Sequence, residues 1–173
     1  GDISTVPTFA VSHLASRRVR AVLSGEAADE IFCGYTWQRD YMAARAEGDP
    51  AADDLVAYYA HSMAMGSFAR ARLAGLLHPD LHAHLPDDPW WFYRSLVRPE
   101  LPSLQRMQWL DIRAFMGEQV LTKVDRASMA SSLEVRVPFL DPDLVELLFG
   151  LDPAVYFRPG QPKPLLKATL AGS

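Results

Sequence analysis

The chain has little of what several protein classes depend on. Its 173 residues include one cysteine, Cys33, which excludes an internal disulfide and a cysteine-based zinc cluster. No apolar run approaches the roughly 20 residues of a membrane-spanning helix, and no basic-then-apolar leader opens the chain. Lys and Arg number 17 against 21 Asp and Glu, and the net charge of -4 disfavours non-specific nucleic-acid binding. We therefore expect a cytoplasmic protein with neither a membrane nor a nucleic acid as partner.

The composition is that of a folded domain. Hydrophobic residues make up 49% of the chain and charged residues 22%, which are ordinary globular values. A chain of 173 residues can bury a sizeable core. It begins at Gly1 and not at methionine, and it ends at Ser173 within a helical pattern, so we expect a piece of a longer protein.

Few segments of the chain have the residue pattern of a β-strand. The β-branched run at 19–23 is the only segment that predicts a strand convincingly. Apolar spacing predicts helices over 8–17, with Phe9 and Leu14 facing inward, and over 29–47, 53–72, 107–117, 118–131 and 144–149. Proline-rich loops are expected at 86–89 and 98–102. Because one strand cannot form a sheet, its neighbours are expected outside this sequence.

The end of that strand is the first candidate site. Ser24 and Gly25 follow the strand directly, and the carboxylates of Glu26, Asp29 and Glu30 come next. Ligands of α/β folds bind at the carboxyl ends of strands, where the free N–H groups of a helix start favour anions. Carboxylates crowded at such a place suit a divalent cation between protein and ligand. The residues alone predict a nucleotide and metal site, with an ordinary strand-to-helix turn as the alternative.

Three motifs extend this interpretation. Residues 23–35 read LSGEAADEIFCGY, which resembles the LSGEGADELFGGY signature of the glutamine-dependent asparagine synthetases. Residues 121–141 read LTKVDRASMASSLEVRVPFLD and resemble the family segment LxKxDRxSMAxSLExRxPFLD. Residues 163–167, KPLLK, are similar to the family's KxLLR. The motifs occur in the family's order and span most of the chain. Ala27 and Cys33 stand where the family has glycine.

The resemblance implies an α/β fold of the ATP-pyrophosphatase type, similar to the adenine nucleotide alpha hydrolases. Residues 1–173 would be the C-terminal portion of one ligase domain, mostly helical with about one strand. The family's phosphate loop, SGGxDS, and its glutaminase domain are absent from this sequence. The upstream half of the same ligase is therefore an expected partner, a homodimer is left open, and this chain alone is expected to be inactive.

The implied reaction joins aspartate, or another carboxylic acid, to ammonia derived from glutamine. ATP first activates the acid as an acyl-adenylate, with Mg²⁺ on the released pyrophosphate, and ammonia then displaces AMP. The alternatives are a related amide-forming ligase of secondary metabolism, of the β-lactam synthetase or lasso-peptide cyclase type, and a catalytically silent helical module that binds or regulates a partner.

By resemblance, six residues form the candidate site. The family positions matched by Ser24 and Gly25 contact the nucleotide through their backbone, and Lys123 is a further candidate for cofactor binding. The resemblance makes Glu26 and Lys163 catalytic, with Lys163 stabilising the charge of adenylation. It makes Asp29 a ligand of Mg²⁺.

Three of the four charged candidates also have a simpler interpretation. Glu26 could complement the dipole of the helix that follows, and Lys123 could belong to a structural ion-pair network with Asp125 and Arg126. Lys163 could be an exposed lysine without a function.

Overall fold

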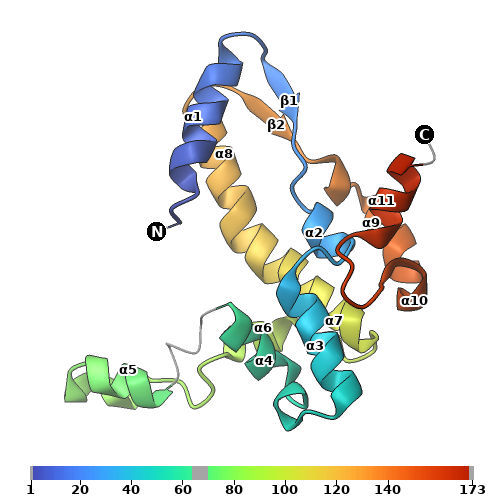
Figure 1. Cartoon of the computed structure of the whole chain (residues 1–173). Helices are drawn as coiled ribbons and strands as arrows, with labels where there is room; N and C mark the ends of the chain where they lie inside the picture. Colours follow the sequence, from blue (N-terminus) through green and yellow to red (C-terminus); the bar gives the residue numbers. More distant parts are fainter. Residues whose placement is uncertain (1, 64–69, 172–173) are drawn as a thin grey trace. The chain divides into compact units, whose positions relative to one another are not determined.

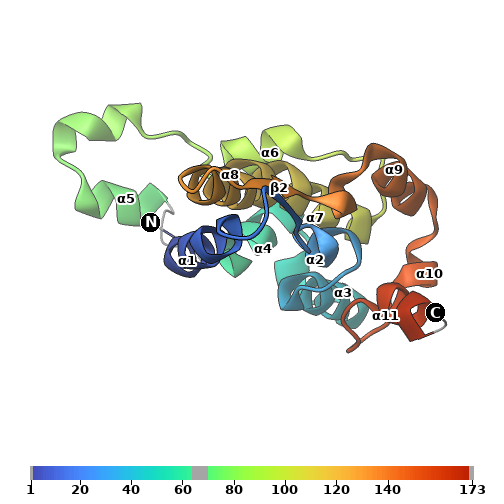
Figure 2. The same ribbon diagram turned by 90° about the horizontal axis from the view of Figure 1, so that it is seen from above.

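The computed structural model describes residues 2–63 and 70–171. The chain divides into two compact units, Gly1–Tyr35 with Asp111–Ser173, and Thr36–Leu110. The structure is mostly helical with one small parallel sheet, and Figures 1 and 2 show it from two directions. No helix within the described ranges is long and apolar enough to cross a membrane.

The first unit contains the sheet. Its elements are α1 (Thr5–Ser16), β1 (Ala21–Leu23), α2 (Ala28–Ile31), the π-helix η4 (Asp111–Val120), α8 (Leu121–Met129), β2 (Glu134–Arg136), the 3-10 helix η5 (Pro138–Leu140), α9 (Pro142–Gly150), α10 (Pro153–Tyr156) and α11 (Pro164–Ala171). Helix α1 packs along α8, and α8 contacts β2 (Figures 1 and 2).

The prediction of a single strand is wrong, because β1 has a partner within the chain. Strand β2 pairs with β1 in parallel, with Val22 opposite Val135 and Leu23 opposite Arg136. The sequence Glu134–Arg136 holds only one β-branched residue, so its extended form follows from pairing and not from propensity. The described chain is therefore mostly helical with a two-stranded parallel sheet, one strand more than expected.

The first helix is present, but the prediction of its inward face is wrong. Phe9 is 46% exposed and Leu14 67% exposed, whereas Ser12 is buried. Helix α1 turns the small residues Thr8, Ser12 and Ala15, which lie one turn apart, toward the sheet. Val11 borders the same cavity, whereas Phe9 and Leu14 lie outside its lining.

The predicted helix over 29–47 is broken into two. Helix α2 is a single turn that ends at Ile31, and α3 begins at Thr36. Cys33 adopts a positive φ of 59°, which no α-helix can continue. The Cys33 side chain is buried.

Two apolar clusters hold the first unit together. One joins Ala27 to the helical stretch of η4 and α8 through Met116, Val120 and Val124. The other packs Ile31 and Phe32, which lie at the end of α2, against Leu148 of α9 and against Leu165 and Leu166 of α11. Together they anchor the segment after β1 from both sides.

The second unit is helical. It comprises α3 (Thr36–Glu47), the 3-10 helix η1 (Pro50–Ala52), α4 (Leu55–Ser62), α5 (Arg70–Leu76), the 3-10 helix η3 (Pro79–His84), α6 (Trp91–Leu96) and α7 (Ser103–Leu110). The predicted helix over 53–72 is matched by α4 and the start of α5, and the part at 64–69 lies outside the described residues. The proline-rich loops at 86–89 and 98–102 are confirmed.

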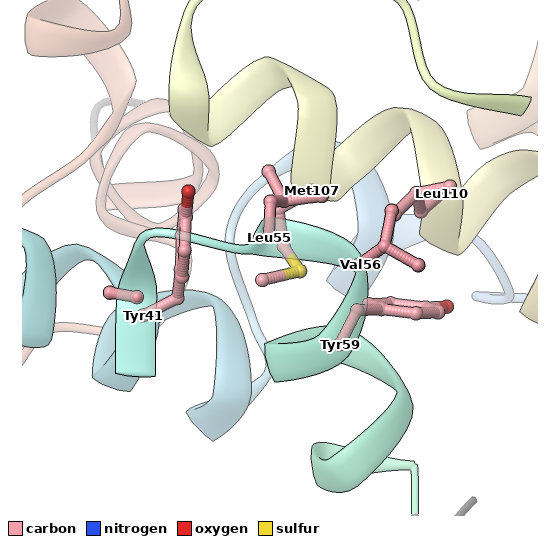
Figure 3. Packing of buried hydrophobic residues seen from close by; sticks show 7 residues of the cluster. Tyr41, Leu55, Val56, Tyr59, Met107 and Leu110 are labelled. Carbon is pink, nitrogen blue, oxygen red and sulfur yellow. The ribbon is translucent and has the colours of Figure 1, made fainter. Parts of the chain in front are cut away.

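The core of this unit is aromatic and aliphatic. Tyr41 of α3, Tyr59 of α4 and Met107 of α7 are almost completely buried in one cluster, with Leu55, Val56 and Leu110 around them (Figure 3). Asp54 is the N-cap of helix α4, and its carboxylate accepts the backbone N–H groups of Val56 and Ala57 at 3.0 Å.

Candidate functional site

The loop after β1 is held by the neighbouring strand. The Ser24 N–H donates to the carbonyl of Arg136 at 2.8 Å, which carries the parallel pairing one residue past β1. The Ser24 hydroxyl accepts the Glu26 N–H at 3.3 Å and turns the chain. Gly25 is exposed, and a side chain there would meet no atom within 4 Å. The predicted loop therefore lies at the carboxyl end of the sheet with an open face at Gly25.

A cavity of about 550 Å³ lies beside this loop. Helix α1, both strands and the start of α8 form its walls, which are largely aliphatic. Its polar lining residues are Ser4, Thr8, Ser12, Ser24 and Glu26. None of the described residues that line it is basic. The structure thus brings Ser24 and Glu26 to one cavity, as a joint role in a ligand site requires.

Asp29 and Lys163 form an ion pair. Lys163 Nζ lies 2.9 Å from Asp29 Oδ1, and the two side chains are 27% and 37% exposed. Lys163 comes just before α11 and has a positive φ of 53°, a conformation that non-glycine residues rarely adopt. Strained backbone of this kind gathers at functional sites. The structure therefore joins two predicted site residues that are remote in sequence.

Lys123 has a different neighbourhood. Its ammonium donates to the Ser4 hydroxyl at 2.9 Å and lies 3.6 Å from Asp2 Oδ2. Hydrogen bonds from the Ser4 hydroxyl and backbone N–H hold the pKa of Asp2 below its ordinary value, and Lys123 adds to this shift. Lys123 thus ties the segment before α1 to α8 through Asp2 and Ser4, which are not the Asp125 and Arg126 expected for a structural network, and Ser4 also lines the cavity. Its role in cofactor binding stays a prediction.

Glu30 is the buried carboxylate of the loop. Its side chain is 1% exposed and accepts the Tyr35 hydroxyl at 2.7 Å. Burial is the main cause that raises the pKa of Glu30 above its usual value, against the lowering effect of the Tyr35 hydrogen bond. Burial and the same hydrogen bond raise the pKa of Tyr35. Tyr35 also packs edge-on against Phe115. The Glu30–Tyr35 hydrogen bond and the Tyr35–Phe115 contact together hold the end of the loop against η4.

Asp29 is the residue of this loop predicted to bind Mg²⁺. Among the described residues, no group of three or more His, Cys, Asp or Glu side chains could hold a metal ion by itself. Mg²⁺ is commonly held by one or two carboxylates together with substrate phosphates. Asp29 fits as one such ligand, provided that Lys163 shares or leaves its carboxylate.

Comparison with known proteins identifies the class. The family model described as asparagine synthase matches residues 1–173, so the chain belongs to the asparagine synthase family. The family uses ATP, and its domain implies an adenine nucleotide hydrolase-like fold. No solved structure matches the chain significantly.

Two relatives show how distant the similarity is. The chain is 29% identical over 177 residues to a Mycobacterium tuberculosis protein named "Putative asparagine synthetase (glutamine-hydrolyzing)", covering 83% of this chain and 26% of that protein. It is 26% identical over 195 residues to "Asparagine synthetase (glutamine-hydrolyzing) 1" of Bacillus subtilis, covering 99% of this chain and 31% of that protein. The chain spans between a quarter and a third of the length of these curated relatives.

Sequence reasoning missed one residue at this site. A side chain on Gly34 would collide with both Asp29 and Lys163, so the ion pair depends on a glycine there. The signal was present, since Gly34 is the glycine that this chain keeps where the family motif has two. The reason for a glycine at this position is seen only in the structure, where the Lys163 side chain lies against it.

Proposed function

We propose that this chain is the C-terminal portion of the synthetase domain of an ATP-dependent amide ligase. The ligase would form asparagine from aspartate and glutamine-derived ammonia through an aspartyl-adenylate, releasing AMP and pyrophosphate. The observation that carries the proposal is the family match over residues 1–173, which includes the LSGE loop at the carboxyl end of β1. The upstream half of the ligase would supply the phosphate loop and complete the site.

The proposed reaction has two steps, adenylation of the acid and formation of the amide. A carboxylate oxygen of the acid attacks the α-phosphorus of ATP, the bond from that phosphorus to the bridging oxygen breaks, and pyrophosphate leaves. The nitrogen of ammonia then attacks the acyl carbon, the acyl–oxygen bond to AMP breaks, and the nitrogen loses a proton. Developing negative charge in the first step calls for preorganised cations and N–H donors. The second step calls for a base.

The residues of this chain fit these needs. In the proposal, the backbone at Ser24 and Gly25 approaches the nucleotide, because no side chain blocks Gly25. Glu26, at the cavity, holds the acyl-adenylate reaction centre or accepts the proton of the incoming amine. The ammonium of Lys163 is a flexible point charge suited to phosphate oxygens. Asp29 would hold Mg²⁺, which when bound neutralises the charge of the departing pyrophosphate.

The cavity favours a second candidate as well. Its described lining has no basic residue to pair with the second carboxylate of aspartate. A related amide-forming ligase that activates a more apolar acid would fit these aliphatic walls, with the same adenylation chemistry. A panel of carboxylic acids distinguishes the two.

Replacing the Glu26 carboxylate tests the site. Glu26→Gln, in the full-length natural protein that contains this sequence, should reduce the rate of amide formation by about 100-fold or more, since a positioned acid–base or charged group is worth that much. Glu118→Gln, an exposed carboxylate of η4, is the matched control and should keep the wild-type rate. Retained synthesis by the Glu26 variant would refute the assignment of this residue.

A further inference from the structure

The segment between α2 and α3 brings a glycine against the Asp29–Lys163 ion pair. The Gly34 N–H donates to the backbone carbonyl of Asp29 at 2.8 Å, which folds the chain back over the Asp29 side chain. A Cβ atom on Gly34 would lie 2.6 Å from Asp29 Cγ and 2.6 Å from Lys163 Cε, and would also collide with Asp29 Oδ1. Non-bonded carbon atoms prefer separations of about 3.5–4.0 Å. The ion pair therefore occupies the space that a side chain at this position would need.

We infer that Gly34 is a positioning residue: by lacking a side chain it sets where the Lys163 ammonium lies. The inference rests on the proposed role of Lys163 in adenylation. Gly34 itself would not touch the substrate. It would act only by leaving space for the Lys163 and Asp29 side chains.

The backbones on both sides of the contact are anchored. Leu165 and Leu166 of α11 pack into the cluster that contains Ile31 and Phe32, so Lys163 and the loop share one core. The Lys163 carbonyl accepts the Lys167 N–H at 3.0 Å, which fixes it at the start of α11. Pro164 follows as the first residue of that helix, a position that proline favours.

An added methyl group must therefore be accommodated by side chains. Gly34 does not have a left-handed φ, so alanine can adopt its backbone conformation without strain. The colliding atoms belong to the Asp29 and Lys163 side chains, which can rotate away. Gly34→Ala should thus fold normally while the ion pair opens and the ammonium moves. Since charged groups must lie within about 0.5 Å of the productive geometry, such a shift costs rate.

The experiment uses four variants of the full-length natural protein: Gly34→Ala, Lys163→Met, the double variant, and Gly150→Ala as control. A side chain at Gly150 would meet no atom within 4 Å. ATP–pyrophosphate exchange gives kcat and the KM for ATP, and thermal melting reports folding. Gly34→Ala should lower kcat about tenfold or more, with the KM for ATP changed less than about twofold and melting near that of Gly150→Ala. In the Lys163→Met background it should cost nothing further.

A second readout does not depend on activity. The rate of Lys163 acetylation by acetic anhydride, followed by peptide mass spectrometry relative to exposed Lys167, should rise in Gly34→Ala because the ion pair has opened. Because Lys167 is already exposed in the folded chain, unfolding would raise the same ratio, so the acetylation is compared only at temperatures where melting shows Gly34→Ala to be folded.

The outcomes separate the two hypotheses. Full exchange activity in Lys163→Met would refute the proposed role of the lysine. If Lys163→Met is inactive while Gly34→Ala keeps or exceeds the wild-type kcat, the positioning role is wrong. A further loss from Gly34→Ala in the Lys163→Met background, or an unchanged acetylation ratio in folded Gly34→Ala, would also overturn it.

Discussion

At the residue scale, the loop after β1 holds two non-glycine residues in the left-handed region of the backbone. Ala27 has a φ of 72° and Cys33 a φ of 59°, and both are buried. The family motif LSGEGADELFGGY, which residues 23–35 resemble, has glycine at both positions. A left-handed conformation costs an L-residue about 1–2 kcal/mol, and such strain persists only where the surroundings fix it. Ala27 precedes α2, so its helix propensity adds nothing there.

Relieving this strain should offset the usual cost of a glycine. Ala27→Gly should change the free energy of unfolding by less than about 0.5 kcal/mol, because the relief of about 1–2 kcal/mol of backbone strain balances the loss of a buried methyl group from the cluster with Met116 and the greater entropy of glycine in the unfolded chain. Ala43→Gly, at an exposed position within α3, is the control and should lower it by about 1 kcal/mol. Urea denaturation measures both. A destabilisation by Ala27→Gly equal to that of the control would contradict the backbone assignment.

The buried carboxyl of Glu30 gives a pH-dependent prediction. Burial raises the pKa of Glu30 in the folded state above 4.5, so its contribution to stability is greatest below pH 4.5 and is lost as pH rises through the folded pKa. Glu30→Gln keeps an acceptor for the Tyr35 hydroxyl and never carries a charge.

Glu30→Gln should therefore be more stable than wild type at pH 8, with the advantage shrinking toward pH 4. Urea denaturation across this pH range measures the difference. A difference that is independent of pH, or one that grows in acid, would contradict the account of the buried carboxyl.

At the element scale, patterns of apolar residues predicted that helices dominate, and they do. They could not predict where the helix after β1 breaks, because the break depends on the backbone at Cys33 and on the hydrogen bond from Gly34. They missed β2 because three residues with one valine carry almost no strand signal, and parallel pairing with β1 supplies the rest. The inward face of α1 was mispredicted because the helix packs through its small residues.

The start of α4 offers an element-scale prediction. Asp54 caps this helix and also accepts a bidentate pair of hydrogen bonds from Arg94 at 3.1 and 2.8 Å. Asp54→Ala should lower the free energy of unfolding by about 1–2 kcal/mol, since a lost N-cap costs about that much. Asp53→Ala is the matched control: its carboxylate lies 3.5 Å from Arg45 and is mostly exposed, so the change should stay within about 0.5 kcal/mol.

The same substitution has a pH dependence. The Arg94 hydrogen bond is the main cause that lowers the pKa of Asp54 below 3.8. The carboxylate therefore stabilises the folded state fully above pH 3.8, and this contribution is lost as pH falls through the lower folded pKa. The free energies of unfolding of wild type and Asp54→Ala should differ by the same amount from pH 8 to pH 5. They should become equal only in strong acid. Convergence already at pH 5 would contradict this.

At the scale of the whole molecule, the first unit has an incompletely covered sheet. In the described part of the chain, β1 and β2 pair only with each other, and Leu23 is 75% exposed. Exposed apolar side chains also line α1, among them Val6, Val11 and Leu14. Two short strands are marginal without further partners, and parallel sheets are normally covered on both faces.

Residues 1–173 alone should therefore be weakly stable or self-associating. Their melting temperature should depend on protein concentration, and sedimentation should show species larger than a monomer, because exposed apolar patches associate. The longer natural protein should melt higher under the same conditions. A sharp two-state melt of a monomer, independent of concentration, would show that the sheet needs no further cover.

The place of the candidate residues in the fold was predictable in part, but which of them lie together was not. Motifs placed Ser24, Gly25 and Glu26 after a strand, and the structure puts them after β1, with Ser24 and Glu26 lining a cavity. Nothing in the sequence relates Lys163 to Asp29, since that contact is created by the packing of α11 on the end of α2.

The central claim is that this chain forms part of an adenylating amide ligase, and ATP–pyrophosphate exchange tests it most directly. Exchange is measured with Mg²⁺ and a panel of carboxylic acids, on the full-length natural protein and on residues 1–173 alone. The account predicts exchange that requires aspartate, in the longer protein only. Exchange with another acid would keep the chemistry and change the substrate. No exchange with any acid, in a folded protein that carries the upstream half, would contradict the claim and favour a catalytically silent module.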